Sequence, residues 1–509
     1  MTHYLRRFLI SFFLIFWATL IMATPKMGGE LIYGIASGTV TVGVDPHVIQ
    51  GDRTGWILSQ VCEGLVNYDQ SMNIVPWLAK SWQISDDGKQ YLFILQEKVT
   101  FHNGREMKAA DVKYSFERIL DPATASRRRQ NLEIIDSIEV LDDYTVRFNL
   151  KTSFSPFLTY LAGAYGAIIP KESVDADGKI THPVGTGPFI FVEWDKNVQL
   201  TVQKNPAYWI KGVPYLDKII FKPLPDEAVR LTALRTGAVD IIHSVPEKLL
   251  PKLSKTKDRK FDLSIEPGVA WRMLIFNTRK PPFDNIKLRQ AVNYALDREE
   301  LMLANTWGFG AVKNQIWPEK SFWFMGNPPV NQDLAKVKQL LTEAGYPNGI
   351  DVSLEVKPGF LPVAEVVQNQ LKKANIRAKL GVIDWASLKP KMLDYNYDMV
   401  VSGAGWYSDP DARYGRFYAS DGPANYFSGG YANQQVDDLI AKGRVEVVPA
   451  KRKAIYQEIF NIIDEEVPHL MLFHLPMTHA QRKNVKGFSV TKQGDLAFSG
   501  GGLPYTWKE

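Results

Sequence analysis

Hydrophobic and polar positions alternate clearly in the first third of the chain. Residues 91–95 alternate with a two-residue period, so the odd positions share one face, and this pattern predicts a strand. The sequence Ser-Asp-Asp-Gly at 85–88 precedes the strand and is typical of a tight turn. Residues 110–120 instead follow a helical period that places Val112 and Phe116 on one side. A strand and an amphipathic helix are therefore predicted here.

In the second half of the chain the pattern alternates between helices and strands. Alternation of this kind is typical of βαβ units, so we predict an α/β fold here. Gly345 is expected to close the helix before it as a carboxyl-end cap. The predicted helices cover residues 288–301, 333–344, 363–374 and 385–393, and the predicted strands cover 352–356, 376–383 and 397–401.

The strand predicted at 397–401 leads into a polar segment rich in aromatic residues and glycine. In an open α/β sheet, ligands bind at the carboxyl ends of the strands. Trp406 and Tyr407 would supply flat apolar walls, and Asp409 or Asp411 would supply a fixed negative charge. A surface turn is the alternative, because Asp-Pro and Gly are common turn formers.

The amino-terminal residues resemble an export signal. Arg6 and Arg7 precede an apolar run over residues 8–22, which is shorter than the ~20 residues of a membrane-spanning helix. We therefore expect a secretory signal peptide over residues 1–23, cleaved after Ala23, and a periplasmic mature protein. An uncleaved anchor is the alternative, because Ile21 stands where a small residue is expected. The run is not followed directly by a cysteine, so the lipid-attachment pattern is missing.

Composition and charge narrow the possible classes. The chain has 509 residues, which suits two or three domains, and 45% of them are hydrophobic. Cys62 is the single cysteine, so no intramolecular disulfide forms, and we interpret it as a small buried hydrophobe. The formal charge is +5, and the one basic tract, residues 127–129, is read as a solvated turn without interleaved aromatics. Nucleic acid is therefore not expected as a partner.

Several motifs occur together in a recognisable order. Residues 78–118 carry Ser-Trp, Ser-Asp-Asp-Gly, Phe-His-Asn-Gly and Ala-Asp-Val-Lys-Tyr-Ser-Phe-Glu-Arg elements. Further blocks follow at 185–189, 205–209, 276–278, 282–284, 289–298, 340–346, 397–399 with 405–406, and 425–427. Together they resemble the peptide and nickel type (family 5) extracellular solute-binding proteins of ABC importers. The resemblance covers essentially the whole mature chain.

The resemblance implies an α/β fold of the two-lobe periplasmic-binding-protein type (type II, the large family 5 form), with a hinge and an extra domain on the first lobe. By analogy, the first lobe holds residues 28–68, 184–270 and 481–509. Residues 69–183 form the extra domain inserted in it, and residues 271–480 form the second lobe.

The resemblance also implies where a ligand binds. In peptide-binding relatives an aspartate shortly after a Gly-Trp pair receives the α-amino group of the ligand, and Asp409 matches that aspartate best. Gly405 and Trp406 form the pair, and Trp406, Tyr407 and Trp385 would wall the ligand. This sequence departs from the common pattern because no longer spacer precedes its Asp-Pro.

Two basic residues near this site leave alternatives open. Arg413 would either clamp a ligand carboxylate or pair with Asp409 or Asp411 to hold the loop, and we favour the pairing. Dipeptide-binding relatives carry an arginine for the peptide carboxylate in the region 356–362, where this chain has only Lys357. That difference weakens a strictly dipeptide interpretation.

No catalytic pattern stands out. The sequence has no phosphate-binding Gly-rich Lys-Ser/Thr loop, no nucleophile elbow and no paired-histidine zinc helix. His469, His474 and His479 recur every five residues within an apolar run, so we interpret them as structural. We therefore expect no enzyme activity, no cofactor and no metal site.

The resemblance leads to one leading function. We expect a monomeric periplasmic receptor that captures a peptide or similar small solute in an interlobe cleft and delivers it to the permease of an ABC transporter. A separate ATPase would hydrolyse ATP. The same fold with a non-peptide ligand, such as a metal chelate, haem, an opine, a sugar or glutathione, is the alternative. An enzyme or chaperone on this scaffold is a third hypothesis.

Overall fold

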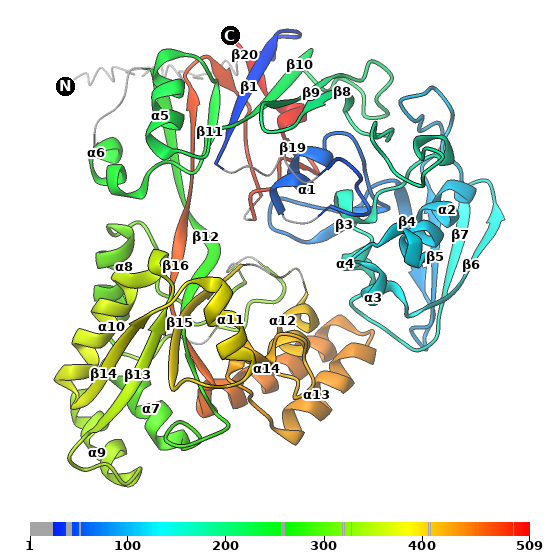
Figure 1. Cartoon of the computed structure of the whole chain (residues 1–509). Coiled ribbons are helices and arrows are strands. Elements are labelled where there is room, and N and C mark those ends of the chain that lie inside the picture. The colour runs from blue at the N-terminus through cyan, green and yellow to red at the C-terminus, as the bar shows by residue number, and fades with distance from the viewer. Residues whose placement is uncertain are drawn as a thin grey trace, which may run out of the picture.

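The computed structural model describes residues 24–509, except 37–42, 50–51, 256–259, 318, 320, 327, 406, 408 and 492. The predicted signal peptide lies outside the described residues. The chain forms two lobes, and a third unit extends from the side of the first (Figure 1). Among the described residues, no helix is both long and apolar enough to cross a bilayer.

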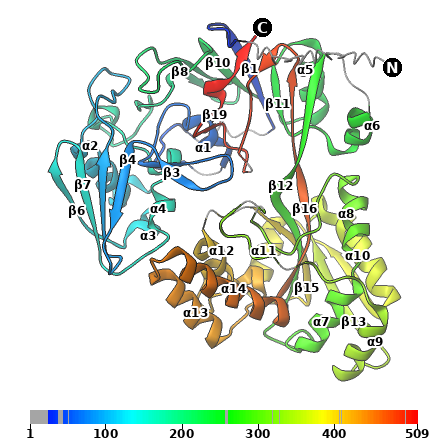
Figure 2. The same ribbon diagram turned by 180° about the vertical axis from the view of Figure 1, so that it is seen from behind.

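One ten-stranded sheet runs through both lobes, in the order β14-β13-β15-β12-β16-β11-β1-β10-β9-β8. Its two longest strands, β12 (Phe261–Phe276) and β16 (His469–Arg482), are neighbours and pair antiparallel along most of their length. The same two strands run from one lobe into the other, as both views show (Figures 1 and 2). The predicted lobe boundaries near residues 270 and 480 fall within them and stay a prediction.

In the first lobe, short strands pair around β1 (Glu30–Ile35), which lies parallel to both of its neighbours, β10 and β11. Buried side chains from these strands, such as Leu31 of β1 and Phe221 of β10, belong to one apolar cluster. The other strands are β8 (Phe189–Asp195), β9 (Gln199–Lys204), β10 (Lys218–Pro223), β11 (Ile241–His243), β17 (Val485–Lys486), β18 (Ala497–Phe498), β19 (Gly501–Gly502) and β20 (Trp507–Lys508). The helices are α1 (Asp52–Leu58), α5 (Glu227–Thr236) and α6 (Leu250–Lys255).

The extra domain is a four-stranded antiparallel sheet packed against α2 (Ala109–Leu120). The rings of Phe93, Phe116 and Phe148 meet edge to face inside it, with centroids 5.1–5.7 Å apart. The strands of this sheet are β4 (Ala79–Ile84), β5 (Gln90–Leu95), β6 (Ile135–Asp142) and β7 (Thr145–Leu150), and the domain also holds α3 (Arg129–Leu132) and α4 (Phe157–Tyr160). A separate antiparallel pair joins β2 (Val66–Tyr68), at the end of the segment predicted for the first lobe, to β3 (Ile74–Pro76). The strand and the helix predicted at 91–95 and 110–120 are confirmed.

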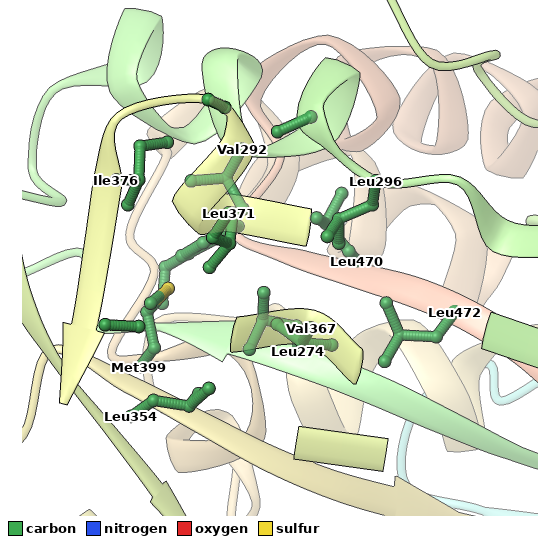
Figure 3. Packing of buried hydrophobic residues seen from close by; sticks show 14 of the residues in the cluster. Leu274, Val292, Leu296, Leu354, Val367, Leu371, Ile376, Met399, Leu470 and Leu472 are labelled. Carbon is green, nitrogen blue, oxygen red and sulfur yellow. The ribbon is translucent and has the colours of Figure 1, made fainter. Parts of the chain in front are cut away.

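The second lobe places helices around the β13, β15 and β14 part of the sheet. Leucines and valines from strands and helices interdigitate in its core, as Leu274, Leu354, Val367 and Leu472 show (Figure 3). The strands are β13 (Ile350–Val356), β14 (Ile376–Val382) and β15 (Met399–Ala404). The helices are α7 (Ile286–Ala295), α8 (Arg298–Thr306), α9 (Leu334–Glu343), α10 (Leu361–Lys373), α11 (Trp385–Leu393), α12 (Pro410–Phe417), α13 (Gln434–Val445) and α14 (Pro449–Glu466).

One predicted helix of this lobe is wrong. The helix expected over 288–301 is two helices, α7 and α8, because the backbone is extended at Leu296 and Asp297. Asp297 starts the second helix by accepting a hydrogen bond of 3.0 Å from the amide of Glu300. Gly345 has a φ of +91°, which confirms its predicted place after the end of α9.

Candidate functional site

A cavity of about 250 Å³, which we call the cleft cavity, lies where the first lobe, the extra domain and the second lobe meet. Aromatic side chains form much of its wall, and a single arginine and a single aspartate are its charged lining residues. Its aromatic and charged lining residues are Trp56, Tyr68, Arg128, Tyr160, Tyr165, Tyr407 and Asp495. Residues from both sides of the cleft therefore face one space.

The extra domain supplies the positive charge of the cleft cavity. Arg128 directly precedes α3, and its guanidinium lies over the ring of Tyr165, 3.9 Å from the centroid. On the first lobe, the ring of Trp56 meets His243 edge to face at 5.2 Å. Contacts of this kind fix the planes of the aromatic walls.

A second, more open hollow of about 1040 Å³ lies between the extra domain and helices α12 and α13. We call it the outer recess. Its charged residues are Arg127, Arg129, Glu133, Asp411, Arg416 and Arg444. Arg129 pairs with Glu133 at 2.9 Å, and Arg444 pairs with Asp411 at 2.7 Å. Arg127 and Arg416 form no ion pair with the described part of the chain, so this side of the cleft has an excess of positive charge.

Hydrogen bonds join the extra domain to the second lobe beside the outer recess. The amide of Ser155 donates to the carbonyl oxygen of Arg444 at 2.7 Å. The hydroxyl of Ser153 donates to the carbonyl oxygen of Val445 at 2.9 Å, and the hydroxyl of Ser155 donates to that of Glu446. The two sides of the cleft are thus in direct contact.

Asp409 lies at the start of α12, where its carboxylate accepts a hydrogen bond of 2.8 Å from the amide of Asp411. Both carboxylate oxygens also accept hydrogen bonds of 2.7 Å from Arg452 of α14. Burial lowers the pKa of Arg452, but the Asp409 carboxylate outweighs that effect and holds the pKa above its usual value. The structure therefore gives Asp409 an internal cation, and its predicted contact with a ligand amino group stays a prediction.

Asp411 has a partner of its own. Its carboxylate accepts a hydrogen bond of 2.7 Å from Arg444 of α13. Burial raises the pKa of Asp411, although Arg444 opposes the shift. Asp411 lines the outer recess rather than the cleft cavity.

The predicted pairing of Arg413 with Asp409 or Asp411 is wrong, because Arg452 and Arg444 take those partners. Arg413 instead turns into the second lobe, where its guanidinium lies 4.8 Å from the ring centroid of Trp271. It donates to the hydroxyl of Tyr418 at 3.1 Å and approaches Nε2 of His469 at 3.0 Å. Arg413 lines a small internal cavity of about 60 Å³ and not the cleft cavity.

The predicted aromatic walls are only partly brought together. Tyr407 lines the cleft cavity and meets Phe417 edge to face at 5.5 Å. Trp385 begins α11, is 40% exposed and stacks against Phe427 at 6.5 Å, outside the described lining of the cavity. Gly405 is exposed at the end of β15, and Trp406 lies outside the described residues.

The three histidines of β16 are buried. Burial and the nearby Arg413 hold the pKa of His469 well below its usual value, so its imidazole is neutral. Both ring nitrogens of His474 face backbone carbonyl oxygens, those of Gly268 and Gln315. Within the described ranges, no group of three His, Cys, Asp or Glu side chains could hold a metal ion.

Sequence reasoning missed most of the cleft cavity. Arg128 belongs to a basic tract that was interpreted as a solvated turn, and Trp56, Tyr165 and Asp495 carried no recognisable signal. The missed clue was the tract itself, since it is the one basic run in the chain. Its orientation could not be read from sequence, because Tyr165 lies far from it along the chain.

Comparison with known proteins places this geometry in a family. Residues 73–425 match the family described as bacterial extracellular solute-binding proteins, family 5 Middle. The chain is 29% identical over 500 residues to the glutathione-binding protein GsiB of Escherichia coli. The alignment covers 94% of this chain and 96% of GsiB.

Solved structures agree. The periplasmic binding protein AgaA of A. tumefaciens, in complex with agropinic acid, is 32% identical with a TM-score of 0.74, over 94% of this chain and 99% of that chain. The ABC transporter-associated DppA of Helicobacter pylori, in complex with the peptide STSA, is 27% identical with a TM-score of 0.75, over 95% and 99%. The match covers most of the chain in sequence and in fold, and the protein belongs to family 5 of the bacterial extracellular solute-binding proteins.

Proposed function

We propose that this protein captures a peptide or another solute of similar size in the cleft cavity and delivers it to the permease of an ABC transporter. The observation that carries the proposal is the cavity itself, which is lined from both lobes and from the extra domain. A solute bound there contacts both sides of the cleft at once. Binding can therefore bring the lobes together and create the surface that a permease recognises.

The size of the cavity favours a small solute. Its volume of about 250 Å³ is close to the lower end of the roughly 300–1,000 Å³ of small-molecule sites. A long extended peptide does not fit such a space. A dipeptide, a tripeptide or a molecule of that size fits better.

A non-peptide solute is the second candidate, and the state of Asp409 favours it. Both oxygens of that carboxylate are bound to Arg452, so a ligand ammonium would have to displace an internal cation. A solute without an α-amino group avoids that cost. Among the relatives, AgaA carries agropinic acid and DppA carries the peptide STSA, so both non-peptide and peptide solutes occur among them.

The remaining features of the proposal follow from family membership and sequence. The protein is exported by its amino-terminal signal, acts in the periplasm as a monomer, and binds no nucleic acid. It carries no catalytic activity of its own, and a separate ATPase drives transport. Tyr407 lines the solute site from the second lobe.

Mass spectrometry of the protein purified from the periplasm without denaturation tests the proposal. We expect a bound small molecule that denaturation releases and that rebinds to the emptied protein at one site. A control preparation with bulky substitutions in the cleft, Ala412→Trp and Gly163→Trp, should carry less of it. Equal recovery from both preparations would contradict binding in the cleft cavity.

A further inference from the structure

We propose that Arg128 is a carboxylate-binding residue of the cleft cavity, so that the solute is a carboxylic acid. This inference rests on the proposed receptor function and names the chemical class of its solute. It changes the interpretation of the basic tract at 127–129, whose middle member faces the cavity rather than bulk water.

The turn that carries Arg128 is fixed by buried contacts. Ser126 is 7% exposed, and its hydroxyl donates a hydrogen bond of 2.7 Å to the carbonyl oxygen of His47. The same hydroxyl accepts a hydrogen bond of 3.3 Å from the amide of Arg128. The position of the Arg128 backbone is therefore set before any solute arrives, which lowers the entropy lost on binding.

The guanidinium plane is also oriented in advance. Arg128 lies over the ring of Tyr165 at 3.9 Å, and both residues line the cleft cavity. Stacking leaves the edge of the guanidinium available to donate two parallel hydrogen bonds. That fork matches the two oxygens of a carboxylate.

Arg128 differs from its neighbours because it is half-buried and has no ion pair with a described residue, whereas Arg127, which also lacks an ion pair, is exposed. Arg118, Arg129, Arg444 and Arg452 each pair with a carboxylate of the protein. Arg128 is half-buried and has no carboxylate partner within the described part of the molecule. A cation that is partly withdrawn from water and lacks a counter-ion favours an anionic ligand.

Other basic residues are less suited to this role. Lys357 lies over the ring of Phe360 at 4.0 Å, and Arg413 is buried against Trp271. Neither belongs to the lining of the cleft cavity. Asp495 lies in that lining too, where its carboxylate accepts a hydrogen bond of 2.8 Å from the hydroxyl of Thr491.

Calorimetric titration with matched acids and amides tests the inference. The probes are glutathione, agropinic acid and a set of di- and tripeptides, each as the free acid and with its carboxyl groups amidated. We expect wild type to bind at least one acid, and to bind its amide about 10- to 150-fold more weakly, as for a lost charged hydrogen bond. In Arg128→Gln that preference should collapse to less than threefold.

The control is Arg377→Gln on β14, whose guanidinium pairs with Asp351 on an exposed surface, and which should keep the acid preference. Circular dichroism and the melting temperature check that both variants fold. An unchanged preference in Arg128→Gln, or a wild type that binds acid and amide equally, would overturn the carboxylate site while leaving the receptor function intact. A wild type that binds none of the probes would also overturn the carboxylate site, whereas the receptor function would fail only if no bound solute were recovered in the mass-spectrometry experiment.

Discussion

Arg452 donates hydrogen bonds of 2.7 Å to both carboxylate oxygens of Asp409, and each of the two side chains is at least 95% buried. This pair joins the start of α12 to α14 beneath the loop that the sequence marked as the ligand site. Asp409 was expected to bind solute, and this pair gives the same carboxylate a structural partner inside the protein.

Arg452→Ala should destabilise the protein by about 3–5 kcal/mol, because it leaves a carboxylate buried without its counter-charge. Arg444→Ala is the matched control. It removes the partner of Asp411, but the Arg444 side chain is 40% exposed, so the loss should be smaller. Urea denaturation, monitored by fluorescence, measures the free energy of unfolding of both variants. Equal losses in the two variants would show that burial of the Asp409 pair has no special cost.

A double variant then tests solute binding. Asp409→Asn with Arg452→Met removes both charges and keeps an amide side chain to cap α12, so stability should largely return. If Asp409 supports only the fold, affinity for the co-purified solute should stay within threefold of wild type. A loss of roughly 30- to 5,000-fold, the range for a buried ammonium deprived of its partner, would instead identify Asp409 as the amino-group site.

The hydrogen bonds from Ser153 and Ser155 to Val445 and Glu446 should stabilise the solute-bound state, because they join the two sides of the cleft. Replacing both serines by alanine should weaken solute binding about 5- to 150-fold, at about 0.5–1.5 kcal/mol for each bond, mainly through faster dissociation. Ser85→Ala is the control, since its hydroxyl bonds only within its own turn. Stopped-flow dissociation of solute distinguishes the variants, and identical rates would argue against these bonds acting across the cleft.

Stability should fall as the pH drops from about 6.5 toward 4. Burial, together with the nearby Arg118, lowers the pKa of His47 from 6.5 to about 4, and a ring nitrogen accepts a hydrogen bond from Arg118. Below pH 6.5, His47 therefore binds a proton in the unfolded chain but stays neutral in the folded protein. This difference favours unfolding increasingly until the pH falls below the pKa of His47 in the folded protein. The loss should reach on the order of 3 kcal/mol.

His47→Gln should remove that part of the pH dependence. Denaturant unfolding of wild type and variant at several pH values between 7 and 4 measures the difference in slope. Curves that run parallel over this interval would contradict the account of His47.

Cys62 should react with thiol reagents only after unfolding. Its side chain is fully buried, and burial raises the pKa of its thiol far above the usual value, so both access and the reactive thiolate are lacking. Labelling with iodoacetamide in rising urea should follow the global unfolding curve. Fast labelling in native buffer would show that this part of the first lobe opens locally.

Local pattern predicted the regular elements well, because helices such as α10 and α11 and the strand β14 between them depend on periodicity and caps within a short window. The break that divides the predicted helix over 288–301 involves a tertiary contact, since the amide of Asp297 donates a hydrogen bond to the side chain of Gln370 in another helix. The site was harder for the same reason. Arg452, the partner of Asp409, lies 43 residues away in the sequence, and no local pattern beside either residue indicates that they pair.

A solute bound between the lobes should close them about the two long strands β12 and β16. Small-angle X-ray scattering of the emptied protein, with and without saturating co-purified solute, tests it most directly. We expect a smaller radius of gyration in the bound state, at a solute concentration where calorimetry confirms occupancy. An unchanged radius with the site fully occupied would contradict it.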